Sequence, residues 1–343
     1  MIPRVKLFLL LGPMALAVAC AAIDSQPHAA SVDRDTLLAD LRVLSADDME
    51  GRLIGSPGGA RARAHVVERF RASGLEAIGQ GYEHPFTFTV RQGDAQADRS
   101  GVNVIGRVAG HSTSGRVIVI TAHYDHVGMR GGEVFNGADD NASGTAALFA
   151  IGRHFSARPP AHTLILAALD GEEGGLRGAR AFVASPPVPL DAIALNVNLD
   201  MIGRDASDVL YAVGTFHYPF LKPYVEQVAA RASITLRTGH DEPGTSGVED
   251  WTRDSDHFVF HERRIPFIYF GVEDFAEHHQ ATDDYETITH DFYVRAVATI
   301  IDAIGVFDAS LDAIAAANVE RSAERQFRVR RNAAVAALVE SYR

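Results

Sequence analysis

One stretch of the chain, residues 121–144, restricts the possible folds more than any other. It reads TAHYDHVGMRGGEVFNGADDNASG and follows the apolar, β-branched run Val117–Ile120, which is typical of a buried strand. His123 and Asp125 come just after this run, and Asp140 precedes a helix-like run. A histidine and carboxylates on such connections are what a metal site at the carboxyl edge of an α/β sheet requires. The alternative explanation is a surface loop rich in turn-forming residues.

Strands and helices alternate through most of the remaining chain. Near-continuous apolar runs such as HTLILAAL at 162–169 indicate strands that are covered on both faces. We therefore predict an α/β fold, a three-layer sandwich whose central mixed, mostly parallel sheet is flanked by helices. The expected helices cover 32–46, 60–73, the run after Ser143, 176–184 and parts of 310–343. The expected strands cover 82–90, 101–108, 117–120, 162–169, 194–199 and 265–271, and 240–254 is expected to be a loop near the site.

The amino terminus has the pattern of an export signal. Arg4 and Lys6 precede an apolar run that continues to Ala19, and Cys20 follows as the only cysteine of the chain. Cys20 stands where a bacterial lipoprotein carries its acylated cysteine, so we expect a lipoprotein signal or an ordinary signal peptide at 1–20. A linker is expected at 21–30 and a single domain at 31–343. The expected location is therefore the periplasm, the outer membrane through a lipid on Cys20, or the outside of the cell.

Composition excludes some classes of protein. With 47% hydrophobic residues the 343-residue chain has enough apolar side chains for a core, so disorder is not expected. The net charge of −12 is the opposite of the basic surface that a nucleic-acid-binding protein needs. No nucleic-acid partner is therefore expected.

Several residues with metal-binding side chains follow predicted strands. Taken singly, each has an ordinary explanation: an acidic pair is usually a solvated turn, and an aspartate can cap a helix. Because carboxyl ends of neighbouring strands meet at one crevice, two imidazoles and several carboxylates placed there suit one or two zinc ions. The residues concerned are His123, Asp140, Glu172, Glu173, Asp200 and His279.

Five ordered motifs carry a resemblance to a known family. They are AHYD at 122–125, GADDNASG at 137–144, GEE at 171–173, NLDMIG at 198–203 and the pattern His279, Asp283, Glu286. On these motifs the chain resembles M28-type zinc aminopeptidases, a family of co-catalytic di-zinc exopeptidases. GRLIGSPG at 51–58 and Ser255-Asp256-His257 are also similar to the family, and the resemblance covers about residues 35–305.

The resemblance implies a set of metal ligands. Asp140 would bridge two zinc ions, His123 and Asp200 would complete one site, and Glu173 and His279 would complete the other. The register of the motifs selects Asp140 over its neighbour at 139, and His279 over its neighbour at 278.

The resemblance also implies catalytic roles. Glu172 would be the general base, and Asp125 would accept the far imidazole N–H of His123 and fix its tautomer. Some family members place a tyrosine beside the last histidine or before the Ser-Asp-His element, where it stabilises the oxyanion. This chain lacks it, so His278 and His257 are the candidates, with a structural role as the alternative for each.

The resulting expectation is an exported di-zinc metalloaminopeptidase that hydrolyses amino-terminal residues from peptides through a metal-activated water. A carboxypeptidase or dipeptidase on the same scaffold is the first alternative. A glutaminyl cyclase, which shares the fold and binds one zinc, is another, as is a non-catalytic interaction domain. The motifs leave the side-chain preference and the oligomeric state open.

Overall fold

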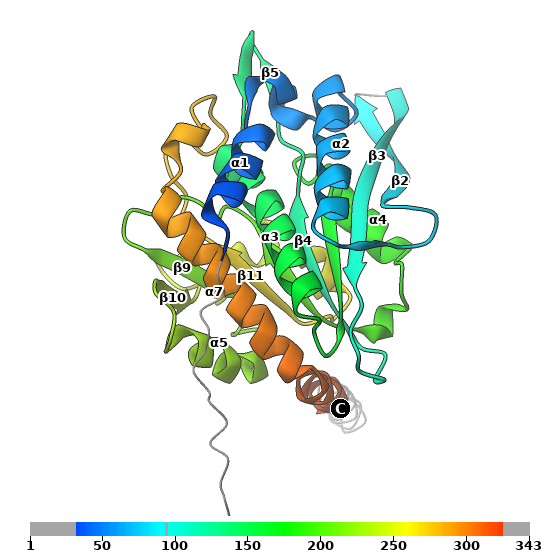
Figure 1. The fold of residues 1–343 in the computed structure, drawn as a ribbon, viewed down its shortest axis with the longest axis vertical. Helices are drawn as coiled ribbons and strands as arrows, with labels where there is room; N and C mark the ends of the chain where they lie inside the picture. The colour runs from blue at the N-terminus through cyan, green and yellow to red at the C-terminus, as the bar shows by residue number, and fades with distance from the viewer. Residues whose placement is uncertain (1–31, 93–94, 325–343) are drawn as a thin grey trace, which may run out of the picture.

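A computed structural model describes residues 32–92 and 95–324 (Figure 1). The predicted signal segment, the linker to residue 30 and Cys20 lie outside these residues, as does the end of the predicted closing helices. The main sheet contains β1 (Glu76–Ala77), β2 (Glu83–Gln92), β3 (Ala95–Val108), β4 (Val117–His123), β7 (Thr163–Leu169), β8 (Ile193–Leu199), β9 (Val209–Val213), β10 (Thr235–Thr238) and β11 (Phe267–Gly271). A small hairpin contains β5 (Gly128–Arg130) and β6 (Glu133–Phe135). The helices are α1 (Arg34–Leu44), α2 (Pro57–Ala72), α3 (Gly144–Ala157), α4 (Arg177–Ala184), α5 (Lys222–Ala229), α6 (His257–Glu262) and α7 (His290–Ala309), and residues 311–324 are also helical.

The main sheet is mixed, as predicted. Its order is β1-β3-β7-β4-β8-β11-β9-β10, with β2 paired to β3. The four central strands β7, β4, β8 and β11 are parallel to one another. Antiparallel pairing joins this centre to β3 on one side and to β9 on the other. Three parallel pairings thus lie in the middle of the sheet, and a fourth joins β9 to β10 at one edge.

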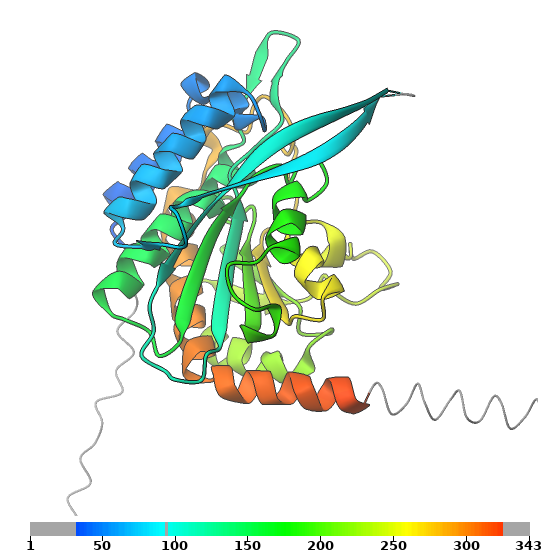
Figure 2. The same ribbon diagram turned by 90° about the vertical axis from the view of Figure 1, so that its right-hand side faces the viewer.

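Helices cover both faces of the sheet, which confirms the three-layer architecture (Figure 2). Successive side chains of β4 point to opposite faces, so Ile118 and Ile120 enter one hydrophobic core while Val117 and Val119 enter a second. The first core includes residues of α1, α2, α3, α5 and α7, and the second includes residues of α4 and α6. Burial on both faces explains why the central strands read as continuous apolar runs.

Two helix starts illustrate how local sequence sets the boundaries. α2 begins at Pro57, three residues before the predicted start, because Ser56 caps it by accepting the N–H of Gly59 and proline suits the first turn. Ser143 occupies the N-cap position of α3, but its side chain does not cap the helix. Asn141 accepts the N–H of Gly144 instead, and the Ser143 hydroxyl donates to the carbonyl of residue 139.

Parallel pairing of the central strands places the ends of β7, β4, β8 and β11 at one edge of the sheet. The loops that leave this edge carry the predicted metal-binding residues. Among residues 32–92 and 95–324, no helix combines the length and the apolar character that crossing a membrane requires.

Candidate metal centre

The first group of metal-binding side chains lies at the ends of β4 and β8. Nε2 of His123 is 3.3 Å from Oδ1 of Asp140 and 3.2 Å from Oδ1 of Asp200, and all three side chains are buried. Bonds of about 2.0–2.1 Å to a tetrahedral zinc place neighbouring ligand atoms roughly 3.3 Å apart. These three atoms therefore have the spacing of ligands to one zinc ion.

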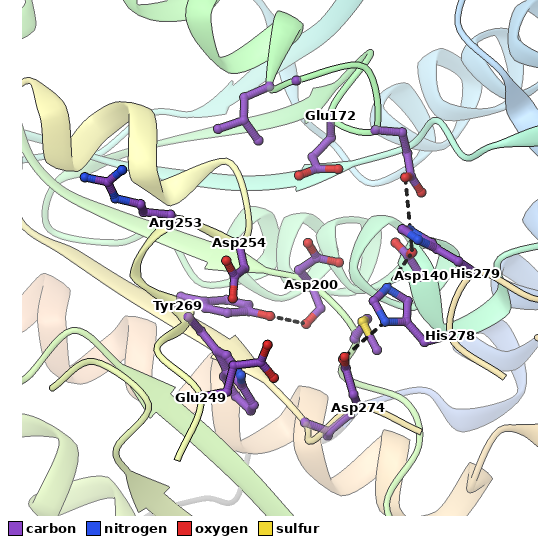
Figure 3. Close-up of a pocket in the computed structure, with 16 residues that line it drawn as sticks. Asp140, Glu172, Asp200, Glu249, Arg253, Asp254, Tyr269, Asp274, His278 and His279 are labelled. Atoms are coloured by element: carbon purple, nitrogen blue, oxygen red, sulfur yellow. Dashed lines mark hydrogen bonds and ion pairs between the residues drawn. The ribbon is translucent and has the colours of Figure 1, made fainter. Parts of the chain in front are cut away.

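The second group consists of Glu173, His279 and Asp140, which it shares with the first (Figure 3). Nε2 of His279 is 3.1 Å from Oδ2 of Asp140 and 3.0 Å from Oε2 of Glu173. The two oxygens of Asp140 thus face different partners, as a carboxylate bridging two cations must. All five predicted ligands lie in these two groups. His278 also approaches Oδ2 of Asp140, at 3.5 Å.

The loop that presents Asp140 is held by Asp283 from the distant end of the chain. The Asp283 carboxylate accepts the backbone N–H groups of Asp139 and Asp140 at 3.1 Å, and its own carbonyl accepts the N–H of Ala138. The motif that pairs His279 with Asp283 thus supplies a ligand and the support of the bridging carboxylate together.

The same loop is also held by Arg52, which is fully buried. Its guanidinium donates to four backbone carbonyls: those of Leu44, Tyr124, Asn136 and Gly137. Two of these carbonyls precede the Asp140 loop, and that of Tyr124 directly precedes Asp125. Burial lowers the pKa of Arg52 to about 10, so it remains charged at neutral pH.

A chain of hydrogen bonds orients Asp200. The Ser255 hydroxyl donates to Oδ2 of Asp200 at 2.6 Å and accepts from the side-chain amide of Asn198 at 2.8 Å. The hydroxyl of Thr121 donates to that amide's oxygen at 2.6 Å. Such supporting bonds fix the direction of a ligand oxygen. The serine of the Ser-Asp-His element therefore has the role of orienting Asp200.

Asp125 has a different hydrogen-bond pattern from the expected one. Its carboxylate Oδ1 lies 3.6 Å from Nδ1 of His123, beyond hydrogen-bond distance, whereas its backbone carbonyl lies 3.1 Å from that nitrogen. The carboxylate instead accepts the backbone N–H of Glu172 at 3.1 Å. The main chain at Asp125, and not its carboxylate, is therefore the hydrogen-bond partner of the imidazole.

Electrostatics separate the two adjacent glutamates. Burial raises the pKa of Glu172 well above its usual value; His123 opposes this rise, and the nearby carboxylates add to it. Burial and Asp140 also tend to raise the pKa of Glu173, but the neighbouring imidazoles of His126 and His279 hold it at about 2. Glu173 is therefore a permanent anion, as a metal ligand should be, while Glu172 has a high affinity for a proton.

A cavity of about 470 Å³ opens onto both groups. Beyond the metal-binding residues, its wall carries the carboxylates of Glu249, Asp254 and Asp274 (Figure 3). His278, one of the two oxyanion candidates, lines it. The other, His257, does not: its buried ring stacks on Tyr269 and its Nε2 bonds the carbonyl of residue 251.

Two residues of the site were not predicted from the sequence. His126, three residues after the first ligand, is buried with Nδ1 2.6 Å from Oε1 of Glu173. The sequence feature that could have indicated it is a histidine directly after the AHYD motif. Arg52 belongs to the GRLIGSPG stretch, which resembled the family without an assigned role.

Curated relatives match only part of the chain. A probable zinc metalloprotease from Leptosphaeria maculans is 36% identical over 112 residues, which cover 31% of this chain and 25% of the relative. A vacuolar membrane protease from Clavispora lusitaniae is 32% identical over 110 residues, covering 32% of this chain and 10% of the relative. The match thus spans a quarter or less of the length of these two relatives.

Solved structures share the fold. A zinc aminopeptidase from Bacillus subtilis superposes with a TM-score of 0.63 at 16% identity, covering 82% of this chain and 96% of that one. A glutaminyl cyclase from Porphyromonas gingivalis gives a TM-score of 0.62 at 18% identity, covering 80% and 98%. The zinc-exopeptidase type of fold is therefore confirmed.

The relatives contradict the expected location. Several are fungal proteins named vacuolar membrane protease, and these names do not agree with a bacterial periplasm, an outer membrane or secretion. The expectation depended on residues 1–20 alone, and these lie outside the described part of the chain.

The model of peptidase family M28 matches residues 103–304, more than half of the 343 residues. This range contains all five motifs and most of the sheet. It also contains every side chain of the two metal-binding groups. The chain belongs to peptidase family M28.

Proposed function

We propose that this protein is a di-zinc aminopeptidase that releases single amino-terminal residues from peptides. The observation that carries the proposal is that the two carboxylate oxygens of Asp140 face different histidines: Oδ1 faces His123 and Oδ2 faces His279. A single-zinc enzyme needs one of these two groups, whereas here each oxygen of Asp140 has an imidazole nitrogen within 3.3 Å.

The side chains support hydrolysis by an activated water. Zinc ions held by the two groups supply Lewis acidity, which polarises the scissile carbonyl and lowers the pKa of water. Glu172 faces the cavity beside Glu173 and takes the proton of the attacking water, because its pKa is raised by burial. It then delivers the proton to the leaving amine. Asp125 positions this base through the N–H of Glu172.

Two side-chain donors line the cavity beside the metal-binding groups and are suited to the developing oxyanion. They are the imidazole of His278 and the hydroxyl of Tyr269. Nδ1 of His278 lies 3.2 Å from Asp274, which keeps its Nε2 directed towards Asp140. Donors fixed before the reaction stabilise charge at the least reorganisation cost.

The wall of the cavity supports recognition of a free α-amine. Glu249, Asp254 and Asp274 gather there, and Arg253 is the one basic side chain among the residues that line it, apart from the histidines. A protonated amine would be attracted by these carboxylates, whereas a carboxyl terminus would be repelled. This favours an aminopeptidase over a carboxypeptidase.

Metal content tests the di-zinc part of the proposal. Elemental analysis of the purified protein should give about two zinc equivalents, and a chelator should remove both and abolish hydrolysis. One equivalent with full activity would refute two catalytic zincs and favour cyclase chemistry on the same fold.

A substrate panel tests the polarity. A free amino-acid p-nitroanilide should be cleaved at least about 10⁴-fold faster than its N-acetyl form, because acetylation leaves the carboxylates of the site unpaired. Amidation of a tripeptide's carboxyl terminus should have little effect. Equal cleavage of free and acetylated substrates would exclude an aminopeptidase, and loss of cleavage on amidation would identify a carboxypeptidase.

A further inference from the structure

We propose that His126 is a further metal ligand, binding the cation that Glu173 and His279 hold. This inference rests on the proposed two-metal site and adds a second imidazole to one half of it. The two halves then differ, with three protein ligands on the His123 side and four on the His279 side.

The position of His126 is fixed by the fold. It lies three residues beyond the end of β4, and its side chain is fully buried. Nδ1 is 2.6 Å from Oε1 of Glu173 and 3.6 Å from Oδ2 of Asp140. Its ring centroid is 5.8 Å from that of His279, so two imidazoles approach the same two carboxylates.

The backbone makes room for this ring. Gly137 lies against it with φ +54°, and a Cβ at Gly137 would come within 2.5 Å of Cγ of His126. Glycine is thus required there for both its conformation and its size. The imidazole is therefore packed from one side by the loop that presents Asp140 and faces Glu173 on another.

The polar atoms of this contact lack hydrogen bonds. Among the described residues, neither ring nitrogen of His126 nor Oε1 of Glu173 has a hydrogen-bond partner, although Nδ1 and Oε1 are close. A buried polar group without a partner costs about 1–3 kcal/mol, so a purely structural histidine would be unfavourable here. A nitrogen and a carboxylate oxygen that are close but not aligned for a hydrogen bond are typical of two ligands directed at one cation.

His278 is the natural comparison. Its Nε2 is 3.5 Å from Oδ2 of Asp140, which is similar to the distance for His126. However, its Nδ1 pairs with Asp274 at 3.2 Å and its side chain is 29% exposed. His278 has a protein partner and water, so its position needs no metal to explain it.

Three variants test the assignment. His126→Leu removes the ligand at similar volume, and His126→Asn keeps a donor atom near the position of Nδ1. His278→Leu is the matched control at the same distance from Asp140. Each variant is titrated with zinc against a chromophoric chelator and with Co²⁺ by visible absorption, and its metal-free form is melted.

The expected result is specific to one of two ions. His126→Leu should weaken one zinc at least about ten-fold and shift the Co²⁺ absorption of that site. His126→Asn should recover part of the affinity, and His278→Leu should leave both affinities within about two-fold. The metal-free melting temperature of His126→Leu measures separately what the contact with Glu173 contributes without zinc, and for a ligand any decrease must come together with the loss of zinc affinity.

Three outcomes would overturn the inference. Unchanged zinc affinities and Co²⁺ absorption in His126→Leu would remove His126 from the ligand set while leaving the two-zinc proposal intact. Loss of metal-free stability without loss of affinity would show a structural histidine. Weakened zinc binding in His278→Leu alone would move the ligand to His278. A wild-type protein that binds one zinc would instead refute the proposed function itself.

Discussion

Replacing Arg52 by methionine should destabilise the protein more than any change at its surface. The guanidinium is fully buried and donates to four backbone carbonyls, three of which precede metal-binding loops. Methionine fills similar space but donates nothing, so three carbonyls lose their donor, while that of Gly137 keeps the N–H of Ala142. At about 1–3 kcal/mol for each unsatisfied group, the lower bound is about 3 kcal/mol. Loss of one partner from a buried charged contact typically costs about 3–5 kcal/mol, which agrees.

This magnitude is large beside the total stability of about 5–15 kcal/mol for a folded domain. In a domain of this size, each kcal/mol lowers the melting temperature by about 2–4 °C, so Arg52→Met should melt about 6–12 °C lower. Thermal unfolding of the metal-free protein, followed by circular dichroism, measures the shift without a contribution from zinc. Arg52→Lys keeps the positive charge but lacks the planar set of N–H donors of a guanidinium. Its melting temperature should therefore lie between those of the wild type and Arg52→Met.

Arg61 supplies the matched control. It also donates to a backbone carbonyl, that of Asp48, and pairs with Glu50, but its side chain is 44% exposed. Exposed pairs contribute about 0–1 kcal/mol, so Arg61→Met should change the melting temperature by at most a few degrees. Equal shifts for Arg52→Met and Arg61→Met, or a shift below about 2 °C for Arg52→Met, would show that the buried guanidinium does not hold the loops together.

Three further results are expected. Glu172→Gln should retain both zincs while turnover falls about 10²–10⁴-fold, and near-normal turnover would reject Glu172 as the base. Ser255→Ala, which removes the hydrogen bond to Asp200, should weaken zinc binding about 10–100-fold in chelator competition. Burial lowers the pKa of His257 to about 3, below the unfolded value near 6.5, so only the unfolded chain gains this proton between those pH values. The resulting stability is complete above pH 6.5 and is lost towards pH 3. In urea unfolding of the metal-free proteins, the free energy of unfolding of His257→Phe should therefore fall less steeply with decreasing pH than that of the wild type.

Sequence patterns were sufficient for the part of the fold that forms the site. The central strands are continuous apolar runs followed by polar motifs, and their parallel order brings those motifs together. The candidate metal-binding residues were therefore predicted from two local signals, a strand and the motif that follows it. The helix α7 was missed because residues around most of its circumference are buried, so it lacks a clear polar face. β9 and β10 are short and depend on neighbouring strands for their pairing.

The missed site residues depend on contacts that no local pattern contains. Arg52 lies 72 to 85 positions from three of the carbonyls that it binds, so its burial could not be inferred from its turn-rich surroundings. The main-chain bond of Asp125 to His123 depends on how the chain turns after β4. Hydrogen bonds of this kind are decided by tertiary packing, which motif spacing does not report.

The same supporting contacts predict how the protein behaves without zinc. Asp283 and Arg52 hold the Asp140 loop, and Ser255 holds Asp200, all through bonds that involve no cation. The two hydrophobic cores also lie beneath the site and do not include its ligands. Folding should therefore precede metal binding, in contrast to zinc fingers, which are unfolded without their metal.

Protons are expected to take the place of the metal charges. Contacts with Asp140 and Glu173 raise the pKa of His279 to about 9, so this imidazole should be charged at pH 7 when zinc has been removed. It then offsets the repulsion between the two carboxylates, and zinc must displace its proton to bind. The chelated protein should keep its near-ultraviolet circular dichroism and unfold cooperatively, and calorimetric zinc titrations in buffers of different ionisation enthalpy should show proton release. A chelated protein that loses its tertiary signal would show that the ligands, and not their supporting residues, order these loops.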